Sequence, residues 1–250
     1  MQEIEPAAGS SPAKSAEPSR ARSAERRRDP EDTKERLLEA AERLFAQRGF
    51  EGTSLRAVTL AAGTSVSAAH YHFGSKEALL VATVRRHAEP VIAERFARLE
   101  RLEREAHGGA LPLEAVLDAF LRPIFEQRAA RADGGEVFRR IAARLFSDPP
   151  EVVASLKREI FGRTAQRFIE ALARALPDKP RDEIALDLQF LVGIMVHVTS
   201  GHLADAPRPP GSAPLGDLAD EVLLRRMVDF VAAGLRSRPG PATPGRRAPR

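Results

Sequence analysis

The segment FAQRGFEGTSLRAVTLAAGTSVSAAHYHFGSKEALL, residues 45–80, decides the fold of this chain. It contains two short runs with helical apolar periodicity, Ser54–Ala62 and Ser65–Phe73, each opened by a serine that can cap a helix. Gly63 separates the runs, as a glycine does where a helix ends. Two short helices joined by such a turn predict a helix-turn-helix unit, whose second helix fits the major groove of DNA.

The same segment lacks acidic side chains. No Asp or Glu occurs from Gly52 to Lys76, whereas Arg56 and Lys76 are basic, and a surface without acids can approach phosphates closely. The net charge of the whole chain, +4, carries less information. Four arginines between residues 237 and 250 account for it, because subtracting 4 from 39 basic residues leaves 35, against 35 acidic ones. Local charge, and not the total, favours nucleic acid as a partner.

Helical spacing divides the second helix into two faces. Ala69 and Phe73, four residues apart, are expected to face the core, which places the residues between them on the outer face. There, Tyr71 is expected to bind a phosphate or else to pack half-buried, and Ser67 to approach a base edge or else to act as a second N-cap. Lys76 is expected to bind a phosphate at the N-terminus of the next helix. The predicted DNA-binding residues are Ser54, Arg56, Ser65, Val66, Ser67, His70, Tyr71, His72 and Lys76.

Several specific features add up to a resemblance. Phe45, Gly49-Phe50, Thr53-Ser54-Leu55-Arg56, Ala62-Gly63 and the run from Tyr71 to Leu79 make residues 31–80 resemble the DNA-binding domain of TetR-family transcriptional regulators. The resemblance implies an all-helical homodimer with an N-terminal reading head and a C-terminal ligand-binding body. Val66, Ala68 and His70 depart from residues common at these positions in the family, so the resemblance does not imply an operator sequence.

The rest of the chain is predicted to be helical too, giving an all-α protein with about nine helices and no sheet. Asp29-Pro30 opens the first helix, Arg48-Gly49 ends it, and Ser75 caps a long helix that continues towards Glu105. Further helices are expected near residues 111–130, 136–146, 150–176, 181–204 and 215–236. The predicted domains are a disordered tail (1–29), the helix-turn-helix domain (30–76), a helical ligand-binding and dimerisation domain (77–236) and a disordered basic tail (237–250).

Phenylalanines gather in the predicted body. Nine of the twelve lie after residue 90, and bulky side chains on long helices can enclose an apolar cavity. Residues 113–123, 137–149 and 189–201 resemble a branch of the family that often controls lipid metabolism, which implies a small apolar effector, for example of the acyl type. His197 is also interpreted as a core or interface residue, because its helix is apolar nearly all round. The predicted pocket residues are Phe96, Phe120, Phe125, Phe138, Phe168 and His197.

The last two helices carry more apolar side chains than one buried face needs. Apolar side chains follow one line along the first of these helices, beginning at Leu186, and another along the second, beginning at Val222. Both helices are predicted to pair with their copies in a four-helix dimer interface. The predicted interface residues are Phe190, Ile194, Val198, Met227 and Phe230, with Val231 beside them.

Other classes of function are disfavoured. Without cysteine, the chain has no disulfide, cysteine-bound zinc or thiol nucleophile, and it shows no catalytic or phosphate-binding motif. No cofactor or metal is therefore expected. No apolar stretch approaches the roughly 18 residues that a membrane span needs, and no secretory signal is present, so the expected location is cytoplasmic. We therefore expect a one-component transcriptional regulator, a repressor that binds operator DNA as a dimer and is released by a small ligand. The alternatives are a constitutive architectural DNA-binding protein and, less favoured, a helical enzyme.

Overall fold

The computed structural model of the chain describes residues 30–130, 140–141, 151, 154, 156–203 and 206–237. Within these ranges every regular element is helical, which confirms the predicted all-α fold. They contain eight α-helices, one π-helical turn and one 3₁₀ turn. The predicted tails, apart from Ser237, and most of the helix predicted at 136–146 lie outside the described residues.

Three helices form the N-terminal head: α1 (Pro30–Arg48), α2 (Leu55–Ala62) and α3 (Val66–Phe73). Capping explains where the two short ones begin, because the hydroxyls of Ser54 and Ser65 each accept an amide N–H at 3.1 Å. Gly63 ends α2 with φ 61°, in the left-handed region that glycine adopts without strain. These boundaries agree with the predicted ones to within one residue.

The long helix α4 (Lys76–Glu105) runs from the head into the body, and Ser75 caps it. The body contains α5 (Leu113–Ala130), α8 (Gly162–Ala175), α9 (Arg181–Thr199) and α10 (Asp220–Arg236). The helix predicted at 150–176 contains a π-helical turn, and the helix predicted at 215–236 begins later than expected. A π-helical turn (Lys157–Phe161) precedes α8, and a 3₁₀ turn (Leu215–Asp217) precedes α10.

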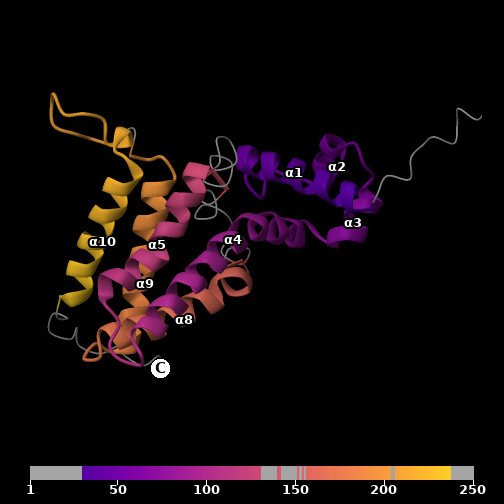
Figure 1. Cartoon of the computed structure of the whole chain (residues 1–250). Coiled ribbons are helices and arrows are strands. Elements are labelled where there is room, and N and C mark those ends of the chain that lie inside the picture. Colours follow the sequence, from indigo (N-terminus) through magenta and orange to yellow (C-terminus); the bar gives the residue numbers. More distant parts are fainter. Residues whose placement is uncertain are drawn as a thin grey trace, which may run out of the picture.

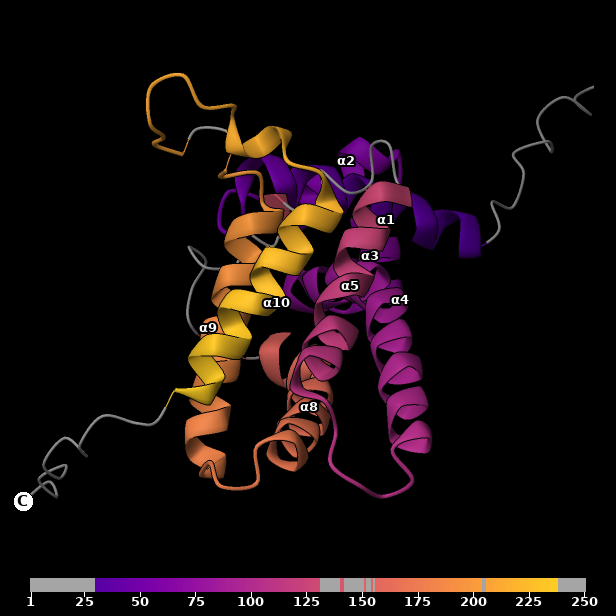
Figure 2. The same ribbon diagram turned by 60° about the vertical axis from the view of Figure 1, so that its left-hand side comes forward.

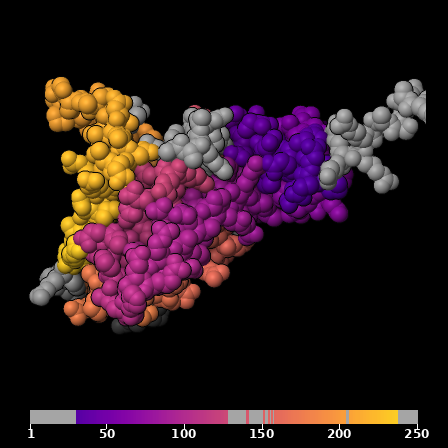
Figure 3. All heavy atoms as spheres, viewed as in Figure 1, coloured from indigo at the N-terminus to yellow at the C-terminus, as the bar shows by residue number. Residues whose placement is uncertain are grey.

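Helix α5 lies at the centre of the body. It packs against α4, α8, α9 and α10, as Figures 1 and 2 show from two directions. The head lies at one end of an elongated molecule and the body at the other, with α4 spanning between them (Figures 1 and 3).

The buried apolar side chains form two clusters that divide within α4. The head cluster joins α1, α2 and α3 to Leu79, Leu80, Val84 and Ala88 of the first half of α4. The body cluster begins at Leu99 and joins α4 to α5, α8, α9 and α10. One continuous helix therefore contributes to both cores.

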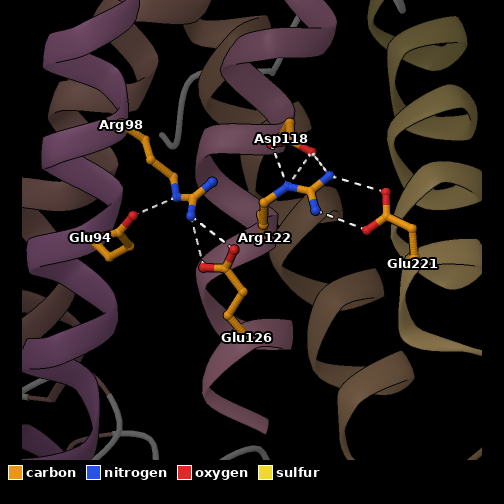
Figure 4. A network of polar contacts seen from close by, with 6 residues as sticks. All are labelled: Glu94, Arg98, Asp118, Arg122, Glu126 and Glu221. Carbon is orange, nitrogen blue, oxygen red and sulfur yellow. Dashed lines mark hydrogen bonds and ion pairs between the residues drawn. The ribbon is translucent and has the colours of Figure 1, made fainter. Parts of the chain in front are cut away.

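Ion pairs lie along the outer side of the body (Figure 4). Arg98 on α4 donates to Glu94 at 2.7 Å and to Glu126 on α5 at 2.8 Å. Arg122 on α5 binds Asp118 at 2.8 Å and Glu221 on α10 at 2.9 Å. Each arginine thus connects two helices through carboxylates.

Candidate functional site

Helix α3 presents its predicted outer face to solvent. Ala69 is buried and Phe73 is partly buried against the head cluster, while Val66, Ser67, His70 and Tyr71 are exposed. Arg56 on α2 is exposed as well. The described geometry therefore brings these predicted DNA-binding side chains to one accessible region of the head.

The structure decides between the two roles considered for Ser67. The amide of Ala68 donates to the hydroxyl of Ser65 and not to that of Ser67, so Ser65 is the N-cap of α3. The Ser67 hydroxyl lies 3.1 Å from that of Ser65 and is exposed. Ser54 has the same capping role on α2. The second-cap interpretation of Ser67 is wrong, and its contact with a base edge stays a prediction.

Tyr71 is the most exposed aromatic side chain of the described residues, at 82%. Its ring contacts only the edge of His72, at a centroid distance of 5.1 Å. The half-buried packing role considered for Tyr71 is therefore wrong. An exposed phenol on the outer face is free to hydrogen-bond a phosphate.

The two predicted histidines of α3 differ in surroundings. His70 is exposed, and its Nδ1 lies 2.7 Å from the carbonyl oxygen of Gly74, at the end of α3. His72 is partly buried between the rings of Tyr71 and Phe73. His70 thus supports the end of the helix, while His72 packs.

Lys76 has a structural contact that the sequence did not indicate. Its ammonium donates to the carbonyl oxygen of Phe50 at 3.1 Å and lies 3.9 Å from the centre of the Phe50 ring. This cation–π contact and hydrogen bond tie the start of α4 to the turn after α1. Replacing Lys76 should therefore affect the stability of the head, because part of its charge is already engaged there.

A carboxylate also stands at the start of α4. Hydrogen bonds from its own backbone N–H and from the Ser75 hydroxyl, with the nearby charge of Lys76, hold the pKa of Glu77 below its ordinary value. An ionised carboxylate at a helix N-terminus is favourable for the helix but repels a phosphate. The phosphate contact of Lys76 at the N-terminus of α4 stays a prediction, and Glu77 opposes it.

Two polar residues, Arg36 and Thr53, connect the helix-turn-helix unit to α1 through hydrogen bonds to backbone carbonyls. Arg36 on α1 donates to the carbonyl of Gly63 at 3.0 Å and also to that of Ala62, so it caps the C-terminus of α2. The buried Thr53 hydroxyl donates to the carbonyl of Gly49 at 2.8 Å and bonds the end of α1 to the start of the unit. The sequence analysis missed both: Arg36 bonds carbonyls 26 and 27 residues away, and the Thr53 hydroxyl bonds Gly49 across a turn whose geometry the sequence does not specify.

Polar side-chain contacts join α1 to α4 where the head meets the body. His87 Nε2 lies 2.8 Å from Glu42, with both side chains largely buried, and Arg86 pairs with Glu35. These contacts connect α1 to α4, the helix that continues into the body.

The predicted pocket residues do not all lie together. Phe120, Phe125 and Phe168 are buried in the body cluster and Phe96 packs against it. Phe138 lies outside the described residues. His197 is exposed and stacks on His202 at 5.4 Å between ring centres, so its assignment to the core of this chain is wrong.

The predicted dimer residues divide into exposed and buried ones. Phe190 on α9 and Phe230 on α10 are exposed at 59% and 70%, which is unusual for phenylalanine. Ile194 and Val198 are half-buried. Met227 is exposed at only 5% and belongs to the body cluster, so its assignment to the interface is wrong, as is that of Val231. Leu186 and Val222 are also exposed on these two helices.

Among the residues that the structure describes, no helix combines the length and apolarity needed to cross a bilayer.

Two family models match the chain. The family described as "Bacterial regulatory proteins, tetR family" matches residues 37–83, which cover most of the head and the start of α4. The family described as "Tetracyclin repressor-like, C-terminal domain" matches residues 118–234, which cover most of the body.

Similar proteins carry related names. HTH-type transcriptional repressor AcnR of Corynebacterium glutamicum is 41% identical over 59 residues, covering 24% of this chain and 31% of AcnR, so the match spans less than a third of that relative. HTH-type transcriptional regulator UidR of Escherichia coli K12 is 25% identical over 177 residues, covering 71% of this chain and 83% of UidR. The solved structure of the fatty acid degradation regulator FadR from Bacillus halodurans superposes with a TM-score of 0.58 over 82% of this chain and 97% of that one, at 15% identity. This last similarity concerns the fold.

Proposed function

This chain belongs to the TetR family of transcriptional regulators, and from that premise we propose that it is a repressor that binds operator DNA as a homodimer and is released by a small apolar effector. Its family consists of regulators and not of enzymes. A partner such as chromosomal DNA favours the cytoplasm as its location.

One observation carries the DNA-binding part of the proposal. The outer face of α3 is exposed, and the stretch from Gly52 to Lys76 contains no carboxylate to repel phosphates. Tyr71 and Arg56 are the exposed groups best suited to phosphates, whereas Val66 and Ser67 lie at the N-terminal end of α3, the end that reads base edges in such units.

The exposed phenylalanines support the homodimer. Phe190 and Phe230 lie on α9 and α10, which pack against each other in the body (Figure 2). Large apolar side chains exposed on two adjacent helices favour an isologous interface, in which each copy buries the same surface of the other.

The proposed release from DNA depends on α4, which extends from the head into the body. The two reading helices of a dimer must reach major grooves roughly 34–36 Å apart. Since α4 contributes to both cores, an effector that favours another arrangement of the body shifts the spacing of the heads and lowers DNA affinity.

Binding to operator and scrambled duplexes across a salt series tests the DNA interface. Tyr71→Phe and Arg56→Ala should weaken both duplexes similarly, and Arg56→Ala should reduce the log–log salt slope by about one unit. Replacing Ser67 with a bulkier residue should instead change the preferred bases, at roughly 1–3 kcal/mol per base pair. If none of these variants changes affinity, slope or preference, α3 is not the reading element.

Light scattering at micromolar concentration tests the dimer. The double variant Phe190→Glu, Phe230→Glu should give the mass of a single chain, because a charge buried in an apolar interface is costly. Leu60→Glu is the matched control, since Leu60 is an equally exposed apolar residue of α2, outside the proposed interface. A monomeric mass for the unaltered protein contradicts the proposal.

A constitutive architectural DNA-binding protein is the alternative that this fold also permits. The two differ in their response to ligands, because linkage requires an effector that lowers DNA affinity to bind the free protein more tightly than the complex. A screen in which no apolar compound both raises the melting temperature and weakens operator binding would favour the constitutive protein.

A further inference from the structure

Arg95 is the only Arg, Lys, Asp or Glu side chain buried among the residues that the structure describes. It lies on α4 within the body and is exposed at only 4%. Burying a cation is costly unless an anion or strong acceptors replace its water. The partners of this guanidinium therefore determine whether the site is complete.

The structure gives Arg95 two neutral partners. Its Nε donates to the carbonyl oxygen of Phe120 at 2.7 Å, and one terminal nitrogen lies 3.2 Å from the sulfur of Met195. The guanidinium also lies 3.9 Å from the centre of the Phe120 ring. Within the described part of the chain, no carboxylate contacts it.

These contacts use one edge of the guanidinium. A guanidinium has five N–H donors, and these two bonds leave three, all on the two terminal nitrogens, whose shared edge faces away from Nε. That edge has the two-donor geometry that binds a carboxylate in bidentate fashion. Burial lowers the pKa of Arg95 to about 9, so the group is still a cation at neutral pH.

A second buried polar group lies on the neighbouring helix. Thr164 on α8 is exposed at only 2%, and its hydroxyl has no hydrogen-bond partner. It is four residues, about one turn, before Phe168, whose ring packs edge-on against Phe120 at 4.9 Å. Thr164 therefore lies one helical turn from the ring that packs on Phe120, the residue that Arg95 contacts. A π-helical turn, a feature frequent at functional sites, precedes Thr164 by a few residues.

We propose that Arg95 is the anion-binding group of the body and that the effector is an apolar carboxylic acid, bound as its carboxylate. The carboxylate takes the free edge of Arg95, with the Thr164 hydroxyl as a further donor, and the apolar remainder packs among the phenylalanines of the body cluster. This inference rests on the proposed effector-controlled function and specifies the chemical class of the effector. A purely structural Arg95 would need no charge, since a neutral donor could bond the Phe120 carbonyl.

Titration calorimetry on the full chain without DNA tests the site separately from DNA binding. The probes are decanoate and 4-phenylbutyrate, each compared with the neutral amide of the same skeleton. Both acids should bind and raise the melting temperature, with the amides roughly ten- to hundredfold weaker, since a hydrogen-bonded charge is lost. Equal binding of acids and amides, or no binding of either acid, overturns the proposal.

Variants of Arg95 test whether this residue binds the carboxylate of the acids. Arg95→Met should weaken the acids roughly ten- to hundredfold and leave the amides unchanged. Arg98→Met is the matched control on the same helix, because Arg98 lies near the surface and already pairs with Glu94 and Glu126. Arg95→Lys, which keeps the charge but not the two-donor edge, serves if Arg95→Met does not fold, and it should also weaken the acids. Unchanged acid affinity in the folded variant overturns the assignment.

Operator release is measured in a second assay. If the acids bind through Arg95 but leave operator affinity unchanged, the anion site stands and the proposed effector control fails. If operator release occurs with acids and amides alike, effector control stands and the anion site fails.

Discussion

The head and the body of this regulator use polar side chains differently. In the head, Thr53 and Arg36 bond to backbone carbonyls at helix ends. In the body, Arg98 and Arg122 bind carboxylates at the periphery (Figure 4). Helices of eight residues have too little apolar surface to fix their own angles, so hydrogen bonds at their ends must do so. Long helices bury enough apolar surface that peripheral ion pairs matter little.

The largest effect should come from the apolar core of the body. Phe168→Ala should lower the free energy of unfolding by about 3–5 kcal/mol, because the ring is buried against Phe120. Phe190→Ala is the control of the same residue type on an exposed site and should change stability little at concentrations where the protein is monomeric. Urea unfolding measures both. Comparable losses for the two variants would contradict the assignment of the body core.

An apolar side chain of the head should matter less. The Phe73 ring is only partly buried, so Phe73→Ala should cost about 2 kcal/mol, below the range for a fully buried phenylalanine. The adjacent Tyr71→Ala should leave the unfolding free energy nearly unchanged, since that ring is exposed. A loss as large as that of Phe168→Ala would show that the head depends on apolar packing as much as the body does.

Removing a single hydroxyl sharpens the comparison. Thr53→Val keeps the shape of the side chain but leaves the Gly49 carbonyl without its donor, which should cost roughly 1–2 kcal/mol. Thr53→Ser keeps the hydroxyl and should recover most of that loss. Thermal unfolding followed by circular dichroism compares the three proteins. Equal stability of the valine and serine variants would show that the hydroxyl does not hold the turn.

Lys76 should contribute to the stability of the head before any DNA is present. Lys76→Ala loses the bond to the Phe50 carbonyl and the cation–π contact, together about 1 kcal/mol. Lys76→Met keeps the apolar stem and separates packing from charge. Unfolding is measured without DNA, so that phosphate binding cannot enter. If Lys76→Ala unfolds with the same free energy as the unaltered protein, Lys76 does not stabilise the head and its proposed role is DNA binding alone.

The smallest effect belongs to a peripheral ion pair of the body. The hydrogen bond from Arg122 and its charge hold the pKa of Glu221 below the ordinary 4.5. A carboxyl with a lowered pKa adds stability above its unfolded value and loses that contribution as the pH falls through its folded value. Glu221→Gln should therefore lower the melting temperature only slightly at pH 7, and the difference should shrink as the pH falls below 4.5 and vanish below the lowered pKa of the folded state. If the difference in melting temperature persists below that pH, the Glu221 side chain stabilises the body by packing and not by its charge.

Local signals explain which parts of the fold could be predicted. Ser54, Ser65 and Ser75 bond amides three residues onward, and Gly63 needs only its own backbone angles, so all four could be predicted from neighbouring sequence. The contacts that the sequence did not reveal join residues far apart. Lys76 reaches Phe50, 26 positions away.

The candidate sites follow the same distinction. The exposed face of α3 follows from helical spacing, and the structure agrees with it. The burial of Met227 and Arg95 depends on which helices lie beside α10 and α4, which periodicity does not specify. A charged residue in an amphipathic helix is normally expected to face solvent, so the burial of Arg95 could not be predicted from its helix alone.

The division of the two cores within α4 has a consequence for dissecting this protein. A fragment ending at Lys76 would contain the whole helix-turn-helix sequence. It would lack Leu79, Leu80 and Val84, which are buried in the head cluster. Even a fragment that includes α4 would lack Ile141 and the segment near Leu156 and Ile160, which also pack into the head cluster. Chimeras that exchange reading heads between relatives should therefore join well inside α4 and carry matching residues from that later segment. The part of the chain that must be exchanged to keep the head folded is therefore larger than the part proposed to bind DNA.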